Sequence, residues 1–335
     1  MSNYSPVNYG DIGARINLYA VATFLRHAEP FAILEKFGKF EEVPKNKSMN
    51  IVWRRAIPYQ AAVDKLVEGV TPTPQGLEYE NVVGVLAQYG SWIPFTDVLI
   101  ETHEDNNLKE MTTLAAEQAV LTKEKILWAT ITGGTNVIYS GVATTRATVV
   151  APFDLNDFRL AQLTLKNAIA RPITKILAAS ERIATQPVAP GYVAFGHTNL
   201  EPDLRNITGF VPRENYSNSS ALLHELEIGK LEDLRFILSP HFSPLLGAGG
   251  ATAAVRNTGG VADVYQIVIL AQDAFAVTPL RGMSAAKVAV KNPVMGESYE
   301  DPLGQRGFVA WKMWYAAARL NEAWLVRMEG AVNLL

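Results

Sequence analysis

Histidine is the residue type best suited to acid–base or metal chemistry near neutral pH, and the chain has five, scattered along the sequence. No pair has the H-E-x-x-H or comparable spacing of metal ligands. His103 is the best candidate, because Glu101, Glu104 and Asp105 surround it in the stretch ETHED. The same acidic residues also fit the beginning of a helix, where negative charge interacts favourably with the helix dipole. We favour this second interpretation, and the histidines predict no metal site.

Nucleophilic and cofactor chemistry has no clear signature either. The chain has no cysteine, which excludes disulfides, thiolate metal sites and cysteine nucleophiles. A Ser-His-Asp arrangement could be assembled from distant residues, as in almost any chain of this size, but no G-x-S-x-G turn supports it. The glycine-rich stretches GAGG (247–250) and GGTN (133–136) lack the Lys-Ser/Thr of a phosphate-binding loop and the spacing of a dinucleotide-binding turn. We therefore predict no catalytic residue, no cofactor and no enzyme activity.

Charge and hydropathy limit the possible partners. The basic cluster between positions 45 and 55 could face nucleic acid, but Glu41 and Glu42 dilute it, and we favour a solvated or intersubunit salt-bridging face. The chain carries 30 basic and 33 acidic side chains, so it has no general electrostatic reason to bind DNA or anionic membranes tightly. Its most apolar segment, 264–277, contains three polar residues and is shorter than a membrane span. Nothing in the N-terminal sequence indicates export.

The element that would organise the rest is a long helix at about 106–132. At ~1.5 Å per residue it would be roughly 40 Å long. Gly133 and Gly134 end the pattern, and Asn107 could cap its first turn together with Glu110. Its apolar positions form two stripes, which predicts burial on two sides. One stripe contains Leu108, Met111, Ala115, Ala119, Ile126 and Ala129, and the other contains Leu114, Leu121 and Trp128.

A second feature is a long ribbon before this helix. The segments 50–59 and 77–95 are rich in β-branched and aromatic residues and are predicted to be its two arms. The 17 residues between them contain two glycines and two prolines, which oppose regular structure. A connection of this length is uncommon inside a compact domain, and a projecting hairpin is only marginally stable alone. We therefore expect a neighbouring molecule to order it.

Shorter elements follow the long helix. An amphipathic helix is predicted at 154–170, with Asp154 as its cap and Leu155, Phe158, Leu165 and Ile169 facing inward. The tail, 307–335, is compatible with a helix or with strands. Residues 1–13 are predicted to be an extended arm. The remaining predictions are a brief helix beginning near Pro202, a helix or turn at 173–183, a surface loop at 247–260, and strands at 135–150, 191–196, 234–238 and 264–277.

Several segments in a fixed order resemble a known family. They are LRHAEPFAILEKFGKFEEVPKNKSMNIVWRR, LVEGVTP, LAQYGSWIPFTDVLIETHED, GGTNVIYSG directly after the long helix, and DPLGQRGFVAWKMWYAAARLNEAWLVRMEGA near the end. Together they closely resemble the major capsid proteins of tailed bacteriophages grouped with the N4 phage capsid protein. The similarity covers roughly 25–141 and 301–331 and is weaker between them. No segment is a catalytic signature, and the specificity comes from their order.

The resemblance implies an α+β protein with the Hong Kong 97-type capsid fold. Its parts would be an N-terminal arm (1–38), an extended β-hairpin loop (39–95), a peripheral domain (96–150 and 278–335) built on a spine helix (106–132), and an axial domain (151–277). The tail would return to the peripheral domain as strands, which decides the choice that periodicity leaves open. The two stripes of the spine helix would then pack on the peripheral sheet and beneath the axial domain or loop.

The resemblance also implies a function. The chain would be a structural major capsid protein of the virion that assembles in the host cytoplasm into pentamers and hexamers of an icosahedral shell enclosing phage double-stranded DNA. A near-neutral subunit suits a wall that contains DNA without binding it specifically, because each phosphate contact would add a salt-sensitive anchor. An encapsulin-like compartment that encloses an enzyme is the alternative, and a soluble hydrolase is a more distant one.

The main expected partner is a second copy of the chain, and no membrane partner is expected. The candidate intersubunit contacts lie on the predicted ribbon and are Arg54, Arg55, Asp64, Lys65, Glu68 and Tyr79. The short arm leaves no room for a scaffolding extension, so scaffolding, like the portal and decoration proteins, would be a separate protein. Some relatives of the fold crosslink a loop lysine to a neighbour's asparagine. We do not expect this of Lys65, because exposed loop lysines are ordinary.

Overall fold

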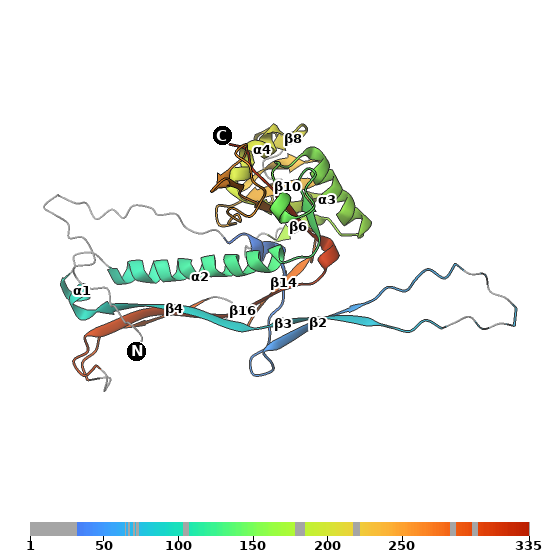
Figure 1. Cartoon of the computed structure of the whole chain (residues 1–335). Coiled ribbons are helices and arrows are strands. Elements are labelled where there is room, and N and C mark those ends of the chain that lie inside the picture. Colours follow the sequence, from blue (N-terminus) through green and yellow to red (C-terminus); the bar gives the residue numbers. More distant parts are fainter. Residues whose placement is uncertain are drawn as a thin grey trace.

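The computed structural model describes residues 32–334, except for residues 64, 66–67, 70, 72–73, 103–106, 178–184, 217–221, 282–285 and 297–300. The predictions for residues 1–31, His103 and Asp64 therefore lie outside the described residues. The described part has an elongated base, formed by a long helix lying on a sheet, and a lobe above one end of that helix (Figure 1). A hairpin projects from the base on the side of the lobe, away from the other end of the helix (Figure 1).

The sheet of the base, here the long sheet, is organised around β16 (Arg306–Arg319). Along one edge of β16 runs the antiparallel β4 (Ala87–Thr96). The other edge of β16 pairs directly with two strands, β15 (Lys287–Lys291) along its first half and β14 (Phe275–Pro279) along its last residues. β14 in turn pairs in parallel with β1 (Lys39–Phe40). The tail forms strands and not a helix. Buried side chains in β16 alternate with more exposed ones, as expected of a strand in a sheet that is covered on one face.

The predicted long helix is confirmed as α2 (Asn107–Thr132), which follows the short α1 (Asp97–Thr102) and ends directly before Gly133. Its first half packs on the long sheet through Ala115 and Ala119, and the Trp311 indole N–H donates to Gln118 Oε1 at 2.9 Å. Its last turns enter a core between the base and the lobe through Leu127, Trp128 and Ile131.

The two predicted stripes of α2 are only partly confirmed in the single chain. Ala129 is exposed, which contradicts its assignment to the buried face. In the second stripe Trp128 is buried and Leu121 half-buried, whereas Leu114 is 44% exposed. The reason is geometric: the lobe covers only the C-terminal end of α2, so no described residue outside the helix covers the side of its first half that faces away from the long sheet (Figure 1).

The predicted ribbon is shorter than expected and is the hairpin of β2 (Asn50–Ala56) and β3 (Tyr79–Val85). Its second arm, predicted as 77–95, is two strands, because β4 begins at Ala87 and pairs with β16 instead of β2. Leu86 lies between β3 and β4 and is buried with Val43 and Ala316. This buried anchor separates the projecting hairpin from the long sheet.

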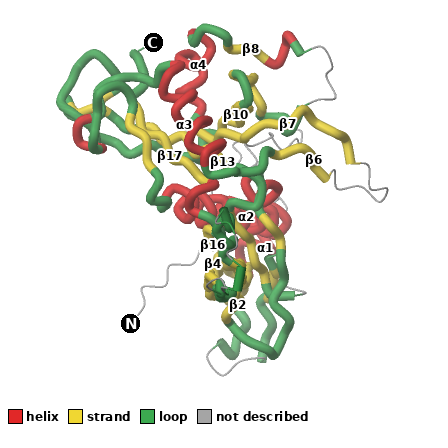
Figure 2. The backbone as a smooth tube through the Cα atoms, turned by 90° about the vertical axis from the view of Figure 1, so that its right-hand side faces the viewer, coloured by secondary structure: helices red, strands yellow, loops and turns green. Residues whose placement is uncertain are grey.

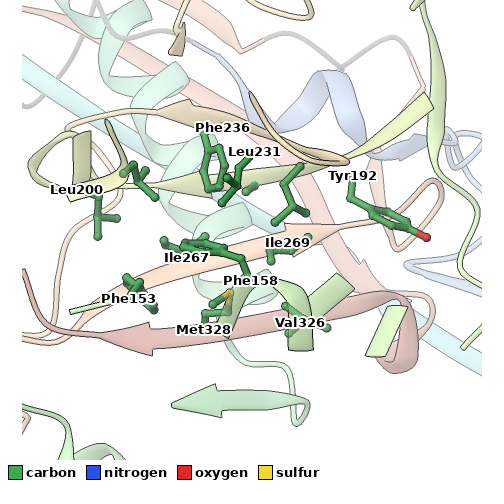
Figure 3. Close-up of a cluster of buried hydrophobic side chains, with 14 of the residues drawn as sticks. Phe153, Phe158, Tyr192, Leu200, Leu231, Phe236, Ile267, Ile269, Val326 and Met328 are labelled. Atoms are coloured by element: carbon green, nitrogen blue, oxygen red, sulfur yellow. The ribbon is translucent and has the colours of Figure 1, made fainter. Parts of the chain in front are cut away.

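The lobe contains a sheet buried on both faces, here the lobe sheet (Figure 2). In the described part of the chain its order is β5 (Val137–Tyr139), β17 (Leu325–Gly330), β13 (Tyr265–Leu270), β7 (Thr185–Gly196), β10 (Leu234–Leu238), β9 (Glu227–Leu231) and β8 (Phe210–Pro212), with β6 (Ile173–Leu177) paired to β7. Val193, Phe195 and Val268 face the core shared with α2. Alternate residues, such as Phe236 and Ile267, face the core beneath α3 (Figure 3).

Helix α3 (Leu155–Asn167) confirms most of the prediction for 154–170. Asp154 caps it, with its carboxylate accepting the Leu155 N–H at 2.7 Å, and Asp157 completes a capping box. Phe158 and Leu165 are buried as predicted (Figure 3). Ile169 is instead 84% exposed, because the helix ends at Asn167 and the chain turns at Ile169 with φ of 52°.

The segment 264–277 is not the single strand that its apolar run predicts. It forms β13 in the lobe sheet and β14 in the long sheet, joined by a turn at Asp273 with φ of 57°. Residues 173–177 are likewise strand β6, where we expect helix or turn. Residues 135–150 contain only the short β5 and the 3-10 turn η3 (Arg146–Thr148), since a strand there has no further partner in the described chain.

The other short elements follow the sequence more closely. The expected brief helix is α4 (Glu201–Asn206), after η4 (Thr198–Leu200), and the strands at 191–196 and 234–238 are confirmed within β7 and β10. The glycine-rich stretch 247–260 is largely irregular and leads through β11 (Asn257–Thr258) into β12 (Val261–Ala262). The remaining 3-10 turns among the described residues are η2 (Leu34–Phe37), η5 (Arg213–Asn215) and η7 (Glu322–Trp324).

Two arginines join the C-terminal end of α2 to the strands. Arg319 at the end of β16 donates to the Thr130 carbonyl at 2.7 Å, and Arg327 in β17 donates to the Thr132 carbonyl. These carbonyls have no partner within the helix, and positive charge is favourable at this end of the helix dipole. Because β16 belongs to the long sheet and β17 to the lobe sheet, the helix end is tied to both.

Candidate assembly surfaces

Two of the histidines that the sequence offers for chemistry, His197 and His224, have structural roles. His197 Nδ1 accepts the Asn199 N–H at 3.0 Å, and His224 Nδ1 accepts the Leu226 N–H at 3.1 Å. Burial lowers the pKa of both rings, and Arg256 and Lys36, respectively, lower it further. Within the described residues no cluster of three or more His, Asp or Glu side chains could hold a metal ion. The part of the chain that is described also contains no helix with the length and apolarity of a membrane span.

The β2–β3 hairpin has two different faces, because residues paired across an antiparallel ladder share a face. One face contains the pairs Trp53–Val82 and Ile51–Gly84, and at the base of the hairpin it packs on β14 and β16. The opposite face contains Val52 and its partner Val83, which are 53% and 55% exposed. The hairpin therefore presents a β-branched apolar surface to solvent in the single chain.

The predicted contact residues Arg54, Arg55 and Tyr79 lie in this hairpin and are exposed. Arg54 Nε donates to Asn81 Oδ1 at 3.0 Å, and its guanidinium lies 5.2 Å from the centre of the Tyr79 ring. Arg55 forms an ion pair with Glu80, its cross-strand partner. Contacts within the hairpin thus hold both arginines in place, and their side chains stay exposed to solvent.

The other predicted contact residues lie near the tip. Lys65 and Glu68 are exposed, and Asp64 lies outside the described residues. The segment 57–78 contains three acidic residues and one lysine, so its charge is negative. It also exposes large apolar side chains, which are Ile57, Tyr59, Val63 and Leu77 at 45%, 56%, 82% and 56%. The distal hairpin is therefore both acidic and apolar, as expected of a segment that binds another surface.

The long sheet leaves one face open, and this face was not predicted from the sequence. Its side chains facing α2, such as Trp311 and Met313, are buried. On the opposite face the hairpin base covers Ala318, whereas Trp92 is 53% exposed and Phe308 is half-buried. The Trp92 and Phe308 rings meet edge to face with centroids 6.4 Å apart. We call this the open face.

The open face is basic as well as aromatic. β4, β15 and β16 contain no acidic residue at all, in a chain with a net charge of −3. Lys312, opposite Gly90, and Lys287, opposite Lys312, lie on the open face, and both are exposed. The pattern could have been found by counting charges in the tail and the β4 segment together. Periodicity in either segment alone does not show that the two are neighbours.

A groove of about 410 Å³ lies where the hairpin joins the body. Its apolar part is formed by Val52, Trp53, Val82, Leu320 and Trp324, and its charged part by Lys39, Glu41, Arg54, Arg55 and Asp273. Glu41 accepts the Trp53 indole N–H at 3.0 Å and pairs with Lys39 at 2.8 Å. The hydrogen bond to Glu41 raises the pKa of Lys39. The base of the hairpin is thus fixed to β1, while its distal part extends into solvent (Figure 1).

This geometry has the features of a subunit that completes its surfaces with other subunits, and a sequence comparison agrees. A model of the phage capsid protein family matches residues 80–328. The chain belongs to this family. It is therefore a structural, non-enzymatic component of a phage capsid, as the sequence analysis predicts. No curated protein sequence shows a significant match to it.

Solved phage capsids have a similar fold. The chain is similar to the capsid of Ralstonia phage GP4, with a TM-score of 0.66 and 11% identity over 99% of both chains. It is similar to the capsid of cyanophage Pam1, with a TM-score of 0.63 and 11% identity over 99% of this chain and 100% of that one. The head of Helicobacter pylori bacteriophage KHP40 matches with a TM-score of 0.61 and 11% identity over 97% of this chain and 96% of that one.

These comparisons confirm the coarse prediction of a mixed α+β, Hong Kong 97-like capsid fold. At 11% identity the likeness to these solved structures shows the fold alone. The narrower resemblance to the N4 phage group stays a prediction. The contact roles of Arg54, Arg55, Asp64, Lys65, Glu68 and Tyr79 also stay predictions, because they require a second subunit.

Proposed function

We propose that this capsid protein assembles into pentamers and hexamers of an icosahedral shell that encloses phage double-stranded DNA, and that assembly occurs in the host cytoplasm. The observation that supports it best is the projecting hairpin, which exposes Val52, Val83 and the apolar side chains near its tip in the single chain. Burying apolar surface contributes roughly 25 cal/mol per Å² before the cost of association is subtracted. Many such contacts, closed by symmetry, would give a stable shell.

In this proposal the described elements take the four roles of the fold. Residues 39–95 supply the extended loop and α2 is the spine helix of the peripheral domain, formed by 96–150 and 278–335. Residues 151–277 supply most of the lobe as the axial domain, and residues 1–38 are the N-terminal arm. Strand pairing crosses these boundaries, because β5 and β17 join the lobe sheet and β4 joins the long sheet. We therefore propose that the parts move together rather than as separate bodies.

The hairpin of one subunit would lie on the open face of a neighbour. The two surfaces match in charge, since the distal hairpin is acidic and the open face contains Lys287 and Lys312. Both surfaces also expose large apolar side chains. Tyr79 and Leu77 on the hairpin and Trp92 on the open face are each at least half exposed. Complementary charge would set the orientation and rate of docking, and apolar burial would hold the contact.

The DNA inside would be contained without specific binding, because the whole chain is close to neutral. Scaffolding, portal and decoration proteins would be separate partners. Tight, strongly salt-dependent DNA binding by isolated capsomers would contradict this part of the proposal. Shells filled with protein instead of DNA would favour the compartment alternative.

Electron microscopy and sedimentation of the purified full-length chain test the assembly directly. A matched variant replaces residues 57–78 by an Asn-Gly turn between Ala56 and Tyr79, which are cross-strand partners. We expect the parent chain to form capsomers or shells, and the shortened variant to keep its circular dichroism spectrum and remain unassembled. Shells from the shortened variant would show that residues 57–78 are dispensable, and a monomeric parent chain at all concentrations would contradict assembly itself.

Charge reversal tests the docking surface. We expect the pair Lys287→Glu and Lys312→Glu to weaken assembly at low salt, because both lysines lie on the open face. Adding Glu68→Lys and Glu78→Lys on the hairpin should restore part of it, because opposite charges would again face each other. An effect of the lysine changes on folding of the unassembled chain, with no effect on assembly, would exclude the open face as the docking surface.

A further inference from the structure

Glu124 is a buried carboxylate in the middle of the longest helix, and assembly does not explain it. It is 3% exposed on the side of α2 that faces the beginning of the described chain. Its Oε1 atom accepts the backbone N–H groups of Ile33 and of Leu34, the latter at 3.0 Å. Its Oε2 atom is also buried and has no hydrogen-bond partner among the described residues. A buried oxygen without a partner is costly and calls for an explanation.

The two N–H groups that Glu124 binds belong to the start of a short segment, residues 33–37, which includes η2. Ile33 and Leu34 are fully buried, and Phe37 meets the Phe195 ring edge to face at 5.2 Å. The segment thus joins the core between α2 and the lobe sheet. Glu124 supplies the first polar attachment between this segment and α2, at the point where the described chain begins.

The charged and titratable groups around Glu124 come from each element packed against it. The turn η2 contributes Glu35 and Lys36, and α2 contributes Lys123, whose Nζ lies 3.5 Å from Glu35 Oε1. β16 contributes Tyr315, whose buried hydroxyl also has no partner among the described residues. The loop before β9 contributes His224, with Nε2 3.3 Å from Lys36 Nζ. No arginine or lysine pairs directly with the Glu124 carboxylate among the ion pairs of the described residues.

We propose that Glu124 is a pH-responsive latch that sets how firmly the segment 33–37 is held on α2. In the closed state the carboxylate is enclosed, whereas local opening of the segment exposes it to water. A proton on Oε2 removes the buried charge and leaves Oε1 free to keep its two hydrogen bonds. Protonated Glu124 therefore holds the segment 33–37 firmly on α2, and ionised Glu124 holds it weakly. This inference concerns the single chain and does not rest on the assembly proposal.

The size of the effect follows from linkage. Burial raises the pKa of Glu124 to about 7 from an ordinary value of 4.5, although the Ile33 and Leu34 N–H groups and Lys36 oppose the rise. Opening returns the pKa to the ordinary value, so the closed state binds the proton more tightly. The opening constant should then increase with pH between the two values, by up to about 300-fold in total, and level off above about pH 7.

Hydrogen exchange of a peptide covering residues 33–37 measures this opening in the unassembled full-length chain. The reference is Glu124→Gln, which keeps an oxygen acceptor and cannot ionise. Taking the ratio of exchange rates, parent over variant, cancels the intrinsic pH dependence of exchange. We expect the ratio to be near one at pH 5 and to rise at least tenfold by pH 8. A ratio that stays constant across this range, or that falls, would overturn the proposal.

Three further variants keep the result specific. Glu124→Leu removes the acceptor, so exchange of the Ile33 and Leu34 amides should be fast at every pH. Glu110→Gln, an exposed change in the same helix, should reproduce the pH profile of the parent chain. His224→Gln should leave the rise between pH 5 and 8 in place. If the ratio of exchange rates, His224→Gln over Glu124→Gln, stays constant between pH 5 and 8, the rise depends on His224 and the assignment to Glu124 is wrong.

Discussion

The lobe sheet is covered on both faces, whereas the long sheet is covered by α2 on one face and for most of its length is open on the other. Strands β10 and β13 of the lobe sheet are buried at every position. In the long sheet β14 is buried throughout as well, because Phe275 and Val277 lie in the core between the base and the lobe. The β2–β3 hairpin, which extends from the long sheet, is exposed at most positions. The comparison indicates that a single chain obtains its folding free energy mainly in the lobe and in the core between the lobe and the base. The surfaces that stay exposed in the single chain lie mainly in the base and hairpin.

The same contrast appears in the ion pairs. In the lobe, Glu329 is fully buried and accepts hydrogen bonds from both Arg146 and Gln266, at 2.6 and 3.1 Å to Oε1. Arg327 Nε lies 2.9 Å from the same oxygen. In the hairpin, the Arg55–Glu80 pair is 45% and 50% exposed. The buried cluster is therefore expected to affect folding, and the exposed pair to be available for contacts with other molecules.

The largest effect on folding is expected from a cavity in the lobe. Phe158→Ala removes a fully buried ring that packs against Phe236 and Phe153, and should destabilise the unassembled chain by about 3–5 kcal/mol (Figure 3). Leu160→Ala is the matched control on the same helix, because Leu160 is 50% exposed and should cost less than about 1 kcal/mol. Chemical denaturation measures both. Equal costs at the two positions would contradict the burial difference on which the comparison rests.

A smaller effect is expected from Glu329→Gln, about 2–3 kcal/mol near neutral pH, because Arg146 loses a charged hydrogen-bond acceptor and the partly buried Arg327 loses a nearby negative charge. Burial alone would raise the pKa of Glu329, but hydrogen bonds from Arg146 and Gln266 and the charges of Arg327 and Arg146 lower it below 4.5 overall. A lowered pKa means that the stabilisation is present above about pH 4.5 and is lost as the pH falls further. The difference between parent and variant should therefore shrink below pH 4.5 in denaturation curves. A difference that is constant down to pH 3 would contradict this.

The hairpin should show the opposite behaviour, with little effect on folding and a clear effect on assembly. The pair Val52→Ser and Val83→Ser changes two exposed residues on one face of the hairpin. We expect less than about 1 kcal/mol on unfolding of the single chain, and at least a tenfold rise in the concentration needed for assembly, which corresponds to about 1.4 kcal/mol. Trp53→Ala, on the buried face of the same strand, should instead destabilise the chain. Normal assembly of the valine variant would remove that face from the interface.

Sequence reasoning was reliable where a single local pattern decides the structure. The apolar spacing and glycine stop define α2, and the cap Asp154 defines the start of α3. It failed where the partner strand decides. The run 264–277 is apolar except at Gln266, Gln272 and Asp273, and its two parts pair with strands of different sheets on either side of the turn at Asp273. Ile169 fits the helical spacing, but the chain leaves the helix two residues earlier.

The surfaces show the same division between local and long-range information. The exposed, acidic hairpin tip could be predicted from its glycines, prolines and charges. The open face could not, because Trp92 and Ala310 are cross-strand neighbours separated by more than two hundred residues in the sequence. The buried Glu124 was also missed, since it lies among Lys123 and Lys125 in a stretch that looks solvated.

The smallest predicted effect concerns the Arg55–Glu80 pair of the hairpin. Both side chains are about half exposed, so solvent screens their attraction, and a double-mutant cycle with Arg55→Ala and Glu80→Ala should give a coupling of about 0.2–1 kcal/mol on unfolding of the single chain. The same cycle measured on assembly separates two roles for these residues. If the hairpin uses Arg55 and Glu80 only to hold each other, the coupling measured on assembly of the folded chains will be close to zero. If they contact a neighbouring subunit, each single change will weaken assembly more than folding. A coupling above about 2 kcal/mol in the single chain would mean that the pair is effectively buried, and the contrast between lobe and hairpin would then not extend to their ion pairs.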